Sequence, residues 1–121
     1  MKIFLYRVSL TMGTLLASSS HTLGQVDSSR AGEYLWSAEG GTLRLCGSDS
    51  VFWVLASPSV LDVLGRGYRM LTTKPHEPIY VRVRGNRSPE KPRGFVERYN
   101  GFFRITSLVE ARRQRRGECG K

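Results

Sequence analysis

The stretch "VFWVLASPSVLDVLGRGYRML", residues 51–71, joins an apolar run to a segment of different periodicity. Residues 51–56 are apolar throughout, which predicts a central strand covered on both faces. Four apolar residues then recur at spacings of three and four, as on one face of an amphipathic helix: Leu61, Leu64, Tyr68 and Leu71. The stretch therefore predicts a strand followed directly by a helix.

The ends of the predicted helix carry local signals. Ser57 and Pro58 suit the N-cap and the first helical position. Gly65 and Gly67 each cost about 1 kcal/mol in a helix interior, so we expect a short helix or a break near Gly65. The Pro-containing segment 72–78 ends it.

Alternating runs precede and follow this stretch. Upstream, residues 33–39 and 42–46 predict two strands, with Gly40 and Gly41 forming a tight reversal between them and residues 47–50 forming the next turn. Downstream, residues 79–84 predict a strand that points Ile79, Val81 and Val83 inward. Residues 85–94, rich in Gly, Pro and charge, predict a mobile loop.

The dipeptide Asn100-Gly101 lies between two alternating runs and predicts a two-residue hairpin turn. The corresponding register places Tyr99 opposite Phe102 and Glu97 opposite Arg104 on one face. The pairs on the other face would be Val96 with Ile105 and Arg98 with Phe103.

The predicted order is three strands, a helix, a strand and a hairpin. This is a mainly β chain, and the order matches a small OB-fold-like Greek-key barrel of five to six antiparallel strands with one helix between the third and fourth. An antiparallel sheet with one packed helix is the alternative.

The N-terminus has the three parts of a secretory signal. Lys2 and Arg7 precede an uncharged, mostly apolar stretch, and small residues follow. We predict cleavage after Gly24, with Ser20 as a second candidate site. The alternatives are an amphipathic first strand or a short anchor. Residues 1–24 would then be a signal peptide, 25–30 a linker, 31–110 the OB-like domain and 111–121 a basic tail.

This division predicts a secreted, periplasmic and soluble domain without stable membrane insertion. The apolar stretch is shorter than the roughly 20 residues that span a bilayer. Removing residues 1–24 takes away two of the 19 Lys and Arg and none of the 10 acids, which leaves a net charge of +7. The excess is concentrated in an anion-binding or merely solvated tail: Arg112, Arg113, Arg115 and Arg116.

The chain has two cysteines, Cys46 and Cys119. In a small exported domain, two cysteines permit one pairing, and a disulfide contributes most where the core is small. We therefore expect a structural Cys46–Cys119 disulfide. Two free thiols and a redox-active dithiol pair are the alternatives.

No catalytic or metal-binding constellation is recognisable, so we expect neither an enzyme nor a cofactor. The sequence contains no G-x-S-x-G or similar nucleophile motif that could use His76 as its base. His76, Glu77 and Met70 meet no metal-ligand spacing rule. His76 is more consistent with a surface loop residue.

Binding is the remaining class of function. Interleaved aromatic and basic residues suit stacking and phosphate pairing on an exposed sheet face, although they also serve simply to cover and solubilise a barrel. The candidate ligand-binding residues are Tyr80, Arg82, Arg84, Tyr99, Phe102 and Arg104. Export favours an envelope protein or an anionic envelope polymer as partner over nucleic acid, and the oligomeric state is not predicted.

The pattern as a whole resembles the C-terminal domain of the NlpE family of bacterial envelope lipoproteins. The resemblance includes a Gly-x-Tyr strand, a cysteine closing the second strand, a helix ending near a tyrosine and a second cysteine near the C-terminus. The matching positions are Gly32, Tyr34, Cys46, Tyr68, Pro78, Gly85 and Cys119.

This resemblance implies an OB-like fold and a disulfide linked in that family to envelope redox sensing. The lipobox cysteine and the Cys-x-x-Cys motif of the family are absent from this sequence. Copper handling and surface-stress signalling depend on those parts and are not expected to transfer. The resemblance thus predicts a non-catalytic binding or envelope-stress module.

Overall fold

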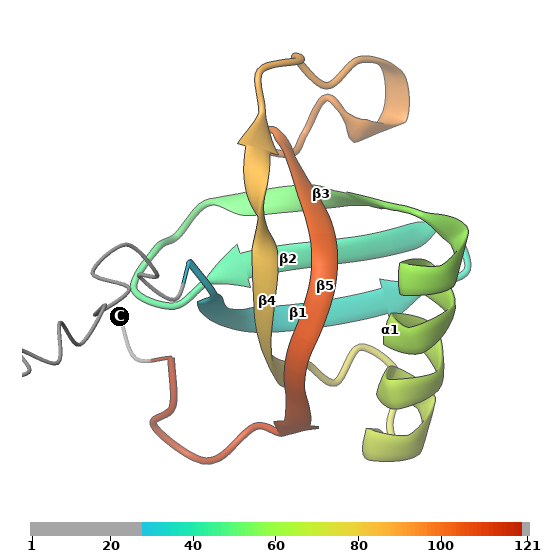
Figure 1. The fold of residues 1–121 in the computed structure, drawn as a ribbon, viewed down its shortest axis with the longest axis vertical. Coiled ribbons are helices and arrows are strands. Elements are labelled where there is room, and N and C mark those ends of the chain that lie inside the picture. Colours follow the sequence, from blue (N-terminus) through green and yellow to red (C-terminus); the bar gives the residue numbers. More distant parts are fainter. Residues whose placement is uncertain (1–27, 120–121) are drawn as a thin grey trace, which may run out of the picture.

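Five strands, one α-helix and one 3-10 helix follow one another along the chain (Figure 1). The structure is a computed structural model that describes residues 28–119. The elements are β1 (Arg30–Ser37), β2 (Gly40–Leu45), β3 (Val51–Ala56), α1 (Pro58–Leu71), β4 (Ile79–Ser88), η1 (Gly94–Val96) and β5 (Phe102–Arg113). The predicted signal peptide lies outside the described residues.

The strands form a closed barrel in the order β1-β2-β3-β5-β4, and β4 pairs with β1 to complete it. This topology, with α1 between β3 and β4, confirms the OB-fold-like barrel. Four of the strand pairs are antiparallel, but β3 and β5 run parallel. The expectation of an entirely antiparallel barrel was therefore wrong at this one pair.

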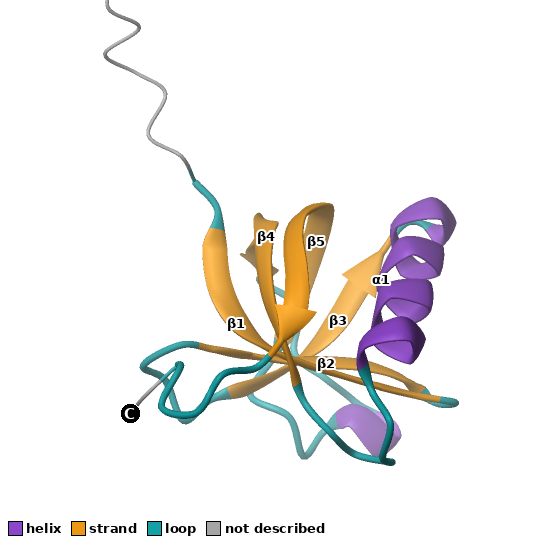
Figure 2. Cartoon of the chain, turned by 90° about the horizontal axis from the view of Figure 1, so that it is seen from below, coloured by secondary structure: helices purple, strands orange, loops and turns teal. Residues whose placement is uncertain are grey.

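The core fills the interior of the barrel, because alternate residues of every strand point inward. Tyr34, Leu43 and Phe52 share one register row across β1, β2 and β3, and all three are buried. The predicted inward residues of β4 are confirmed as buried. Helix α1 stands beside β3 and β5 (Figure 2) and closes this side with Leu64 and Tyr68.

Helix α1 begins and ends as predicted, but it is not broken at its glycines. The Ser57 hydroxyl accepts a hydrogen bond from the Val60 amide, so the cap is confirmed. The helix runs unbroken through both glycines to Leu71, which corrects the expected break. Gly65 is buried against Trp36, where a Cβ would lie 3.4 Å from the indole nitrogen. This is an ordinary van der Waals distance, so the packing of α1 against β1 does not itself require a glycine here.

The apolar stripe of the helix is also shifted from the prediction. Leu61 is 38% exposed. Val60 packs against the core in its place, beside Leu64. At the start of the helix, the buried face therefore includes Val60 and not Leu61, which is one position earlier than the spacing predicted.

The Asn100-Gly101 hairpin does not form, and the four residue pairs predicted from it are absent. Residues 94–96 form η1, and β5 pairs with β4 instead, so that Ser88 lies opposite Phe102. Asn100 binds β3: its side-chain oxygen accepts from the Val51 amide at 2.7 Å, and its own amide donates to the Val51 carbonyl at 2.8 Å. These long-range bonds override the local turn preference.

Two shorter corrections concern the turns. Strand β4 continues to Ser88, so the first part of the predicted loop 85–94 is strand. The reversal between β1 and β2 uses residues 38–39, and Gly40 and Gly41 open β2 instead. Within residues 28–119, no helix has the length and apolar character needed to cross a bilayer.

Candidate ligand-binding cleft

A row of side chains, apolar except for Thr42, crosses the outer face of the barrel. Leu35 of β1 lies opposite Thr42 of β2, Thr42 opposite Trp53 of β3, and Trp53 opposite Phe102 of β5. Their strand neighbours Tyr34, Leu43, Phe52 and Phe103 are buried in the core. Because side chains alternate along a strand, the row faces outward. It is therefore available to form the floor of a surface site.

Two loops rise at either side of this row. The β1–β2 turn brings Glu39, and the β4–β5 loop brings Phe95, Arg98 and Tyr99. At Gly40 a Cβ would overlap the Trp53 ring, so the absence of a side chain there lets the indole lie flat over β2. The local sequence thus positions Trp53 between the two loops.

The row and the loops enclose a cleft of about 360 Å³. A neighbouring hollow of about 410 Å³ is lined by Glu39, Phe95 and Arg98, and it shares Glu39 and Arg98 with the first. The two hollows therefore adjoin each other at Glu39 and Arg98, and we call them together the aromatic cleft. Its lining residues include Leu35, Trp36, Glu39, Thr42, Trp53, His76, Phe95, Arg98 and Tyr99.

In the aromatic cleft, the Trp53 ring contacts two other aromatic rings. The Trp53 and Phe95 ring centroids are 5.4 Å apart with planes at 89°, and those of Trp53 and Tyr99 are 5.3 Å apart. Arg98 lies over Tyr99, 5.0 Å from its centroid, and donates a 2.9 Å hydrogen bond to its hydroxyl. Phe95 remains 66% exposed. Such an exposed aromatic cluster can stack against a flat ligand.

The polar groups of the aromatic cleft suit binding. Glu39 forms no side-chain ion pair or hydrogen bond among residues 28–119. No group of three or more His, Cys, Asp or Glu side chains able to hold a metal occurs in the described part of the chain. The cleft offers one carboxylate, one guanidinium, the imidazole of His76 and hydroxyl groups, arranged around aromatic surface.

The fold and the cleft can be compared with known proteins. The family described as the NlpE C-terminal OB domain matches residues 27–94, which is more than half of the chain. The chain belongs to this family. The match includes β1 to β4 and ends in η1, ahead of β5 and Cys119. No curated protein and no solved structure gives a significant match.

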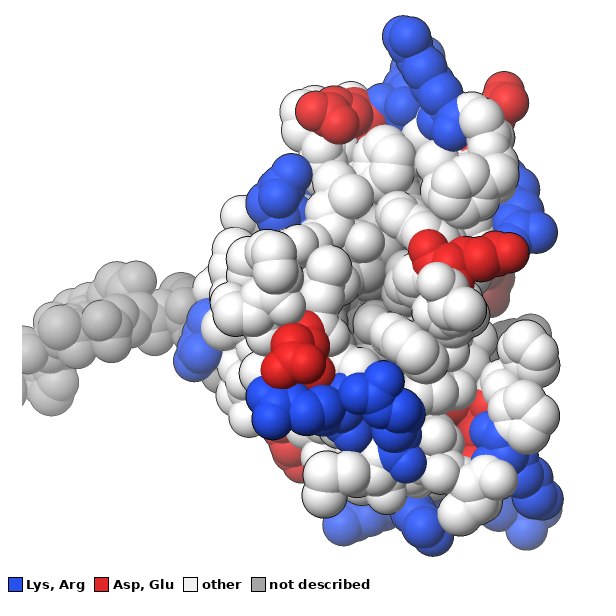
Figure 3. Space-filling view, turned by 90° about the vertical axis from the view of Figure 1, so that its right-hand side faces the viewer, with Lys and Arg blue, Asp and Glu red and all other residues white. Residues whose placement is uncertain are grey.

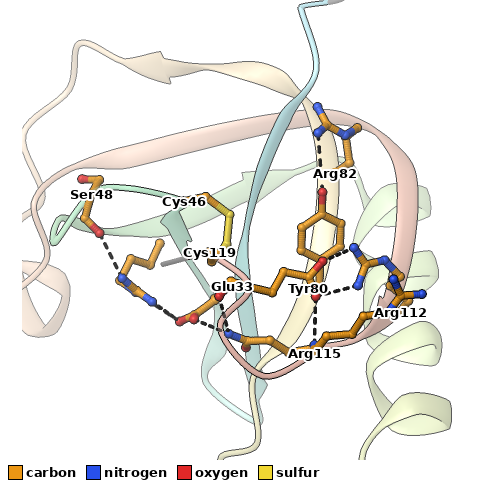
Figure 4. Close-up of a disulfide and its surroundings, with 11 residues drawn as sticks. Glu33, Cys46, Ser48, Tyr80, Arg82, Arg112, Arg115 and Cys119 are labelled. Atoms are coloured by element: carbon orange, nitrogen blue, oxygen red, sulfur yellow. Dashed lines mark hydrogen bonds and ion pairs between the residues drawn. A yellow bond between two sulfur atoms is a disulfide. The ribbon is translucent and has the colours of Figure 1, made fainter. Parts of the chain in front are cut away.

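The second cysteine of this NlpE-type domain is joined to the barrel. A disulfide links Cys46, just after β2, to Cys119, and the Cys46 amide donates to the Ala31 carbonyl on β1. Figure 4 shows the disulfide beside a polar network that extends from Ser48 on one side to Arg112 and Tyr80 on the other. The predicted pairing is confirmed.

Arg112 is the central residue of that network. Its guanidinium carbon lies 3.9 Å from the Tyr80 ring centroid, and it pairs with Glu110 and Glu118. The hydrogen bonds from Arg112 lower the pKa of Glu118 to about 2, because they stabilise the ionised carboxylate. The Gln114 amide donates to Glu33 at 2.5 Å. The segment after β5 is therefore held against β1 and β4.

The six ligand-binding residues predicted from sequence are not gathered in one place. Tyr99 lines the aromatic cleft, and Phe102 lies beside Trp53 at the end of the apolar row. Tyr80 is 7% exposed beneath Arg112, with Arg82 near its hydroxyl. Arg84 and Arg104 are exposed on β4 and β5, away from the cleft lining.

The four predicted tail arginines also differ in their surroundings. Strand β5 continues through Arg113, so Arg112 and Arg113 belong to the barrel. Arg112 is ion-paired, whereas Arg113, Arg115 and Arg116 are exposed.

The main cleft residues were missed from the sequence. Trp53 lies in a run that predicted coverage on both faces, and Phe95 and Arg98 lie in the supposed hairpin. A signal was available in the fold itself, because OB-folds bind ligands on the strand 2–3 face between these two loops. Applying that rule to the predicted strands would have selected Trp53.

Proposed function

We propose that this NlpE-type domain is an exported, non-catalytic binding module of the bacterial cell envelope. Its ligand lies across the aromatic cleft, and the disulfide is a structural link. The observation that carries the proposal is the outward row of Leu35, Thr42 and Trp53 between two loops. This is the face on which OB-folds bind their ligands.

Export and an envelope role are supported by three features. The N-terminal sequence has a signal pattern. A disulfide is typical of an oxidising compartment. The matched family is one of envelope lipoproteins, which favours a part in an envelope assembly or stress response.

Three defined ligand classes test the binding role. The oxidised full-length chain is titrated with neutral tetrasaccharides, with a set of extended decapeptides and with a sulfated dextran, and amide shifts are followed by NMR. We expect one class to shift residues of the aromatic cleft and to lose affinity on Phe95→Ala. Phe95 is exposed, so this change leaves the core intact. Failure of all three classes to shift the cleft would overturn the proposed function.

A second candidate is binding of an anionic oligomer by the arginine-rich end of the chain. The exposure of Arg113, Arg115 and Arg116 favours it. Such binding would weaken steeply with salt because counterions are released. The sulfated dextran arm tests it: binding lost on Arg115→Ala/Arg116→Ala and unaffected by Phe95→Ala would favour this candidate over the cleft.

A further inference from the structure

We propose that the aromatic cleft binds a neutral oligosaccharide built of β-linked, gluco-configured pyranose rings. The inference rests on the proposed binding role of the same cleft and names its ligand class. In such sugars the ring substituents are equatorial, so both ring faces present apolar C–H groups and the edges carry hydroxyls. The cleft offers a matching surface for each of these two parts.

The apolar faces of the sugar meet the aromatic rings. Phe95 and Trp53 stand nearly perpendicular, at 89°, and Phe95 exposes two thirds of its surface. Two rings at right angles can contact adjacent parts of an oligosaccharide, one ring beneath it and one at its side. Stacking of this kind buries apolar area and retains the polar edge of the sugar for hydrogen bonding.

The hydroxyl groups of the sugar meet the rim of the cleft. A hydroxyl both donates and accepts, so it can pair with an acceptor-only carboxylate and with a donor-only guanidinium. Glu39 and Arg98 supply these two groups, and both line both hollows. The free Glu39 carboxylate is the acceptor that such a ligand would use.

The charge of the cleft argues against a polyanion. Binding along a nucleic acid or a sulfated chain requires a track of cations. Here the one arginine of the rim is balanced by Glu39. On the side of the molecule seen in Figure 3, Lys and Arg gather in separate groups with Asp and Glu among them, and uncharged surface lies between the groups.

The barrel topology argues against an extended peptide. Extended peptides gain most of their main-chain hydrogen bonds by adding a strand to an open sheet edge. Within residues 28–119 the five strands close on themselves, and each strand pairs on both sides. A ligand on this face must therefore bind through side chains, as a stacked sugar does.

The test uses two neutral probes, cellotetraose and chitotetraose, against the oxidised full-length chain. We expect saturable shifts of the Trp53 indole N–H and of cleft amides. Phe95→Ala should raise Kd about fivefold to tenfold, since loss of one stacking ring costs about 1 kcal/mol. Glu39→Gln, which keeps the shape but removes the charge, should raise Kd severalfold. Met70→Ala, at an 83% exposed position on α1, is the matched control and should change nothing.

Three results would overturn the inference. One is the absence of shifts with either tetrasaccharide at roughly 10 mM, which would mean a Kd well above that concentration. Another is sugar binding that Phe95→Ala leaves unchanged. The third is binding of the decapeptides alone in a Phe95-dependent manner, which would refute the sugar and leave the proposed binding role standing. If none of the three ligand classes shifts the cleft residues, both the sugar inference and the proposed binding role are overturned.

Discussion

The guanidinium of Arg112 lies over the ring of Tyr80, 3.9 Å from its centroid. The two residues are register partners on β5 and β4. Arg112 also binds Glu118, which is next to the disulfide cysteine Cys119. One side chain therefore connects the barrel wall to the C-terminal link, and both parts should respond when it is disturbed.

The first prediction concerns pH. The pKa of Glu118 is lowered from 4.5 to about 2 in the folded chain, chiefly by the hydrogen bonds from Arg112. A carboxylate whose pKa is lower in the folded chain stabilises the fold at pH values above its unfolded pKa. This stabilisation is lost as the pH falls from the unfolded pKa toward the folded pKa. The difference in unfolding free energy between wild type and Glu118→Gln should be constant near pH 7 and should vanish between pH 4.5 and about 2.

Urea unfolding midpoints measured across this range check the prediction. Glu97→Gln is the control, since Glu97 is exposed on the β4–β5 loop. A difference for Glu118→Gln that stays the same down to pH 2 would show that its carboxylate does not interact with Arg112 in solution.

The second prediction concerns the disulfide, which closes a loop with a sequence separation of 73. Loop-closure entropy predicts that Cys46→Ser/Cys119→Ser lowers the free energy of unfolding by roughly 4 kcal/mol. Chemical denaturation of the double variant beside reduced and oxidised wild type measures it. Reduced wild type should match the variant. Equal stability of the oxidised and reduced protein would exclude a structural role for the bond.

A third prediction compares two glycines. At Gly85 a Cβ would overlap the Arg104 carbonyl on β5, so Gly85→Ala should push β4 and β5 apart and cost about 1–3 kcal/mol. At Gly67, inside α1, a Cβ would meet nothing within 4 Å. Gly67→Ala should therefore stabilise by up to about 1 kcal/mol. Thermal unfolding of both variants tests the opposite signs, and a loss of stability in both would contradict the local geometry.

The fourth prediction concerns the Tyr34 hydroxyl, which is buried and has no hydrogen-bond partner among the described residues. Burial, with a smaller contribution from Tyr68, raises the pKa of Tyr34. An unsatisfied buried hydroxyl costs about 1–3 kcal/mol, so Tyr34→Phe should keep or raise stability. The Tyr34–Tyr68 edge contact is retained by phenylalanine. A clear decrease in the urea midpoint would show that the hydroxyl is satisfied in solution.

Local signals predicted the elements whose structure is decided locally. The alternation in β4 gave its inward residues, and the Ser57-Pro58 pair gave the start of α1. The hairpin failed because Asn100 binds Val51, 49 residues earlier, and no local propensity encodes that bond. The helix continues through Gly65, which is buried, although its local propensity predicted a break there. Tertiary contacts decided the first case, and local propensity was not sufficient in the second.

The candidate site was harder to predict than the fold. The disulfide could be predicted because two cysteines allow one pair. The aromatic cleft could not be predicted from local sequence patterns, because Glu39, Trp53 and Phe95 come from three separate segments of the chain. Their meeting depends on barrel closure and on the long β4–β5 loop. Conversely, the alternating residues Tyr80 and Arg82 suggested an open face, whereas Arg112 covers Tyr80.

The position of β5 in the barrel has a consequence for biosynthesis. Strand β5 pairs with both β3 and β4, and it is the last strand within residues 28–119. Until the ribosome has released residues 102–113, both of its neighbours retain rows of unpaired N–H and C=O groups. A nascent chain that ends before β5 therefore has two open strand edges, and its barrel can close only after residues 102–113 have been synthesised.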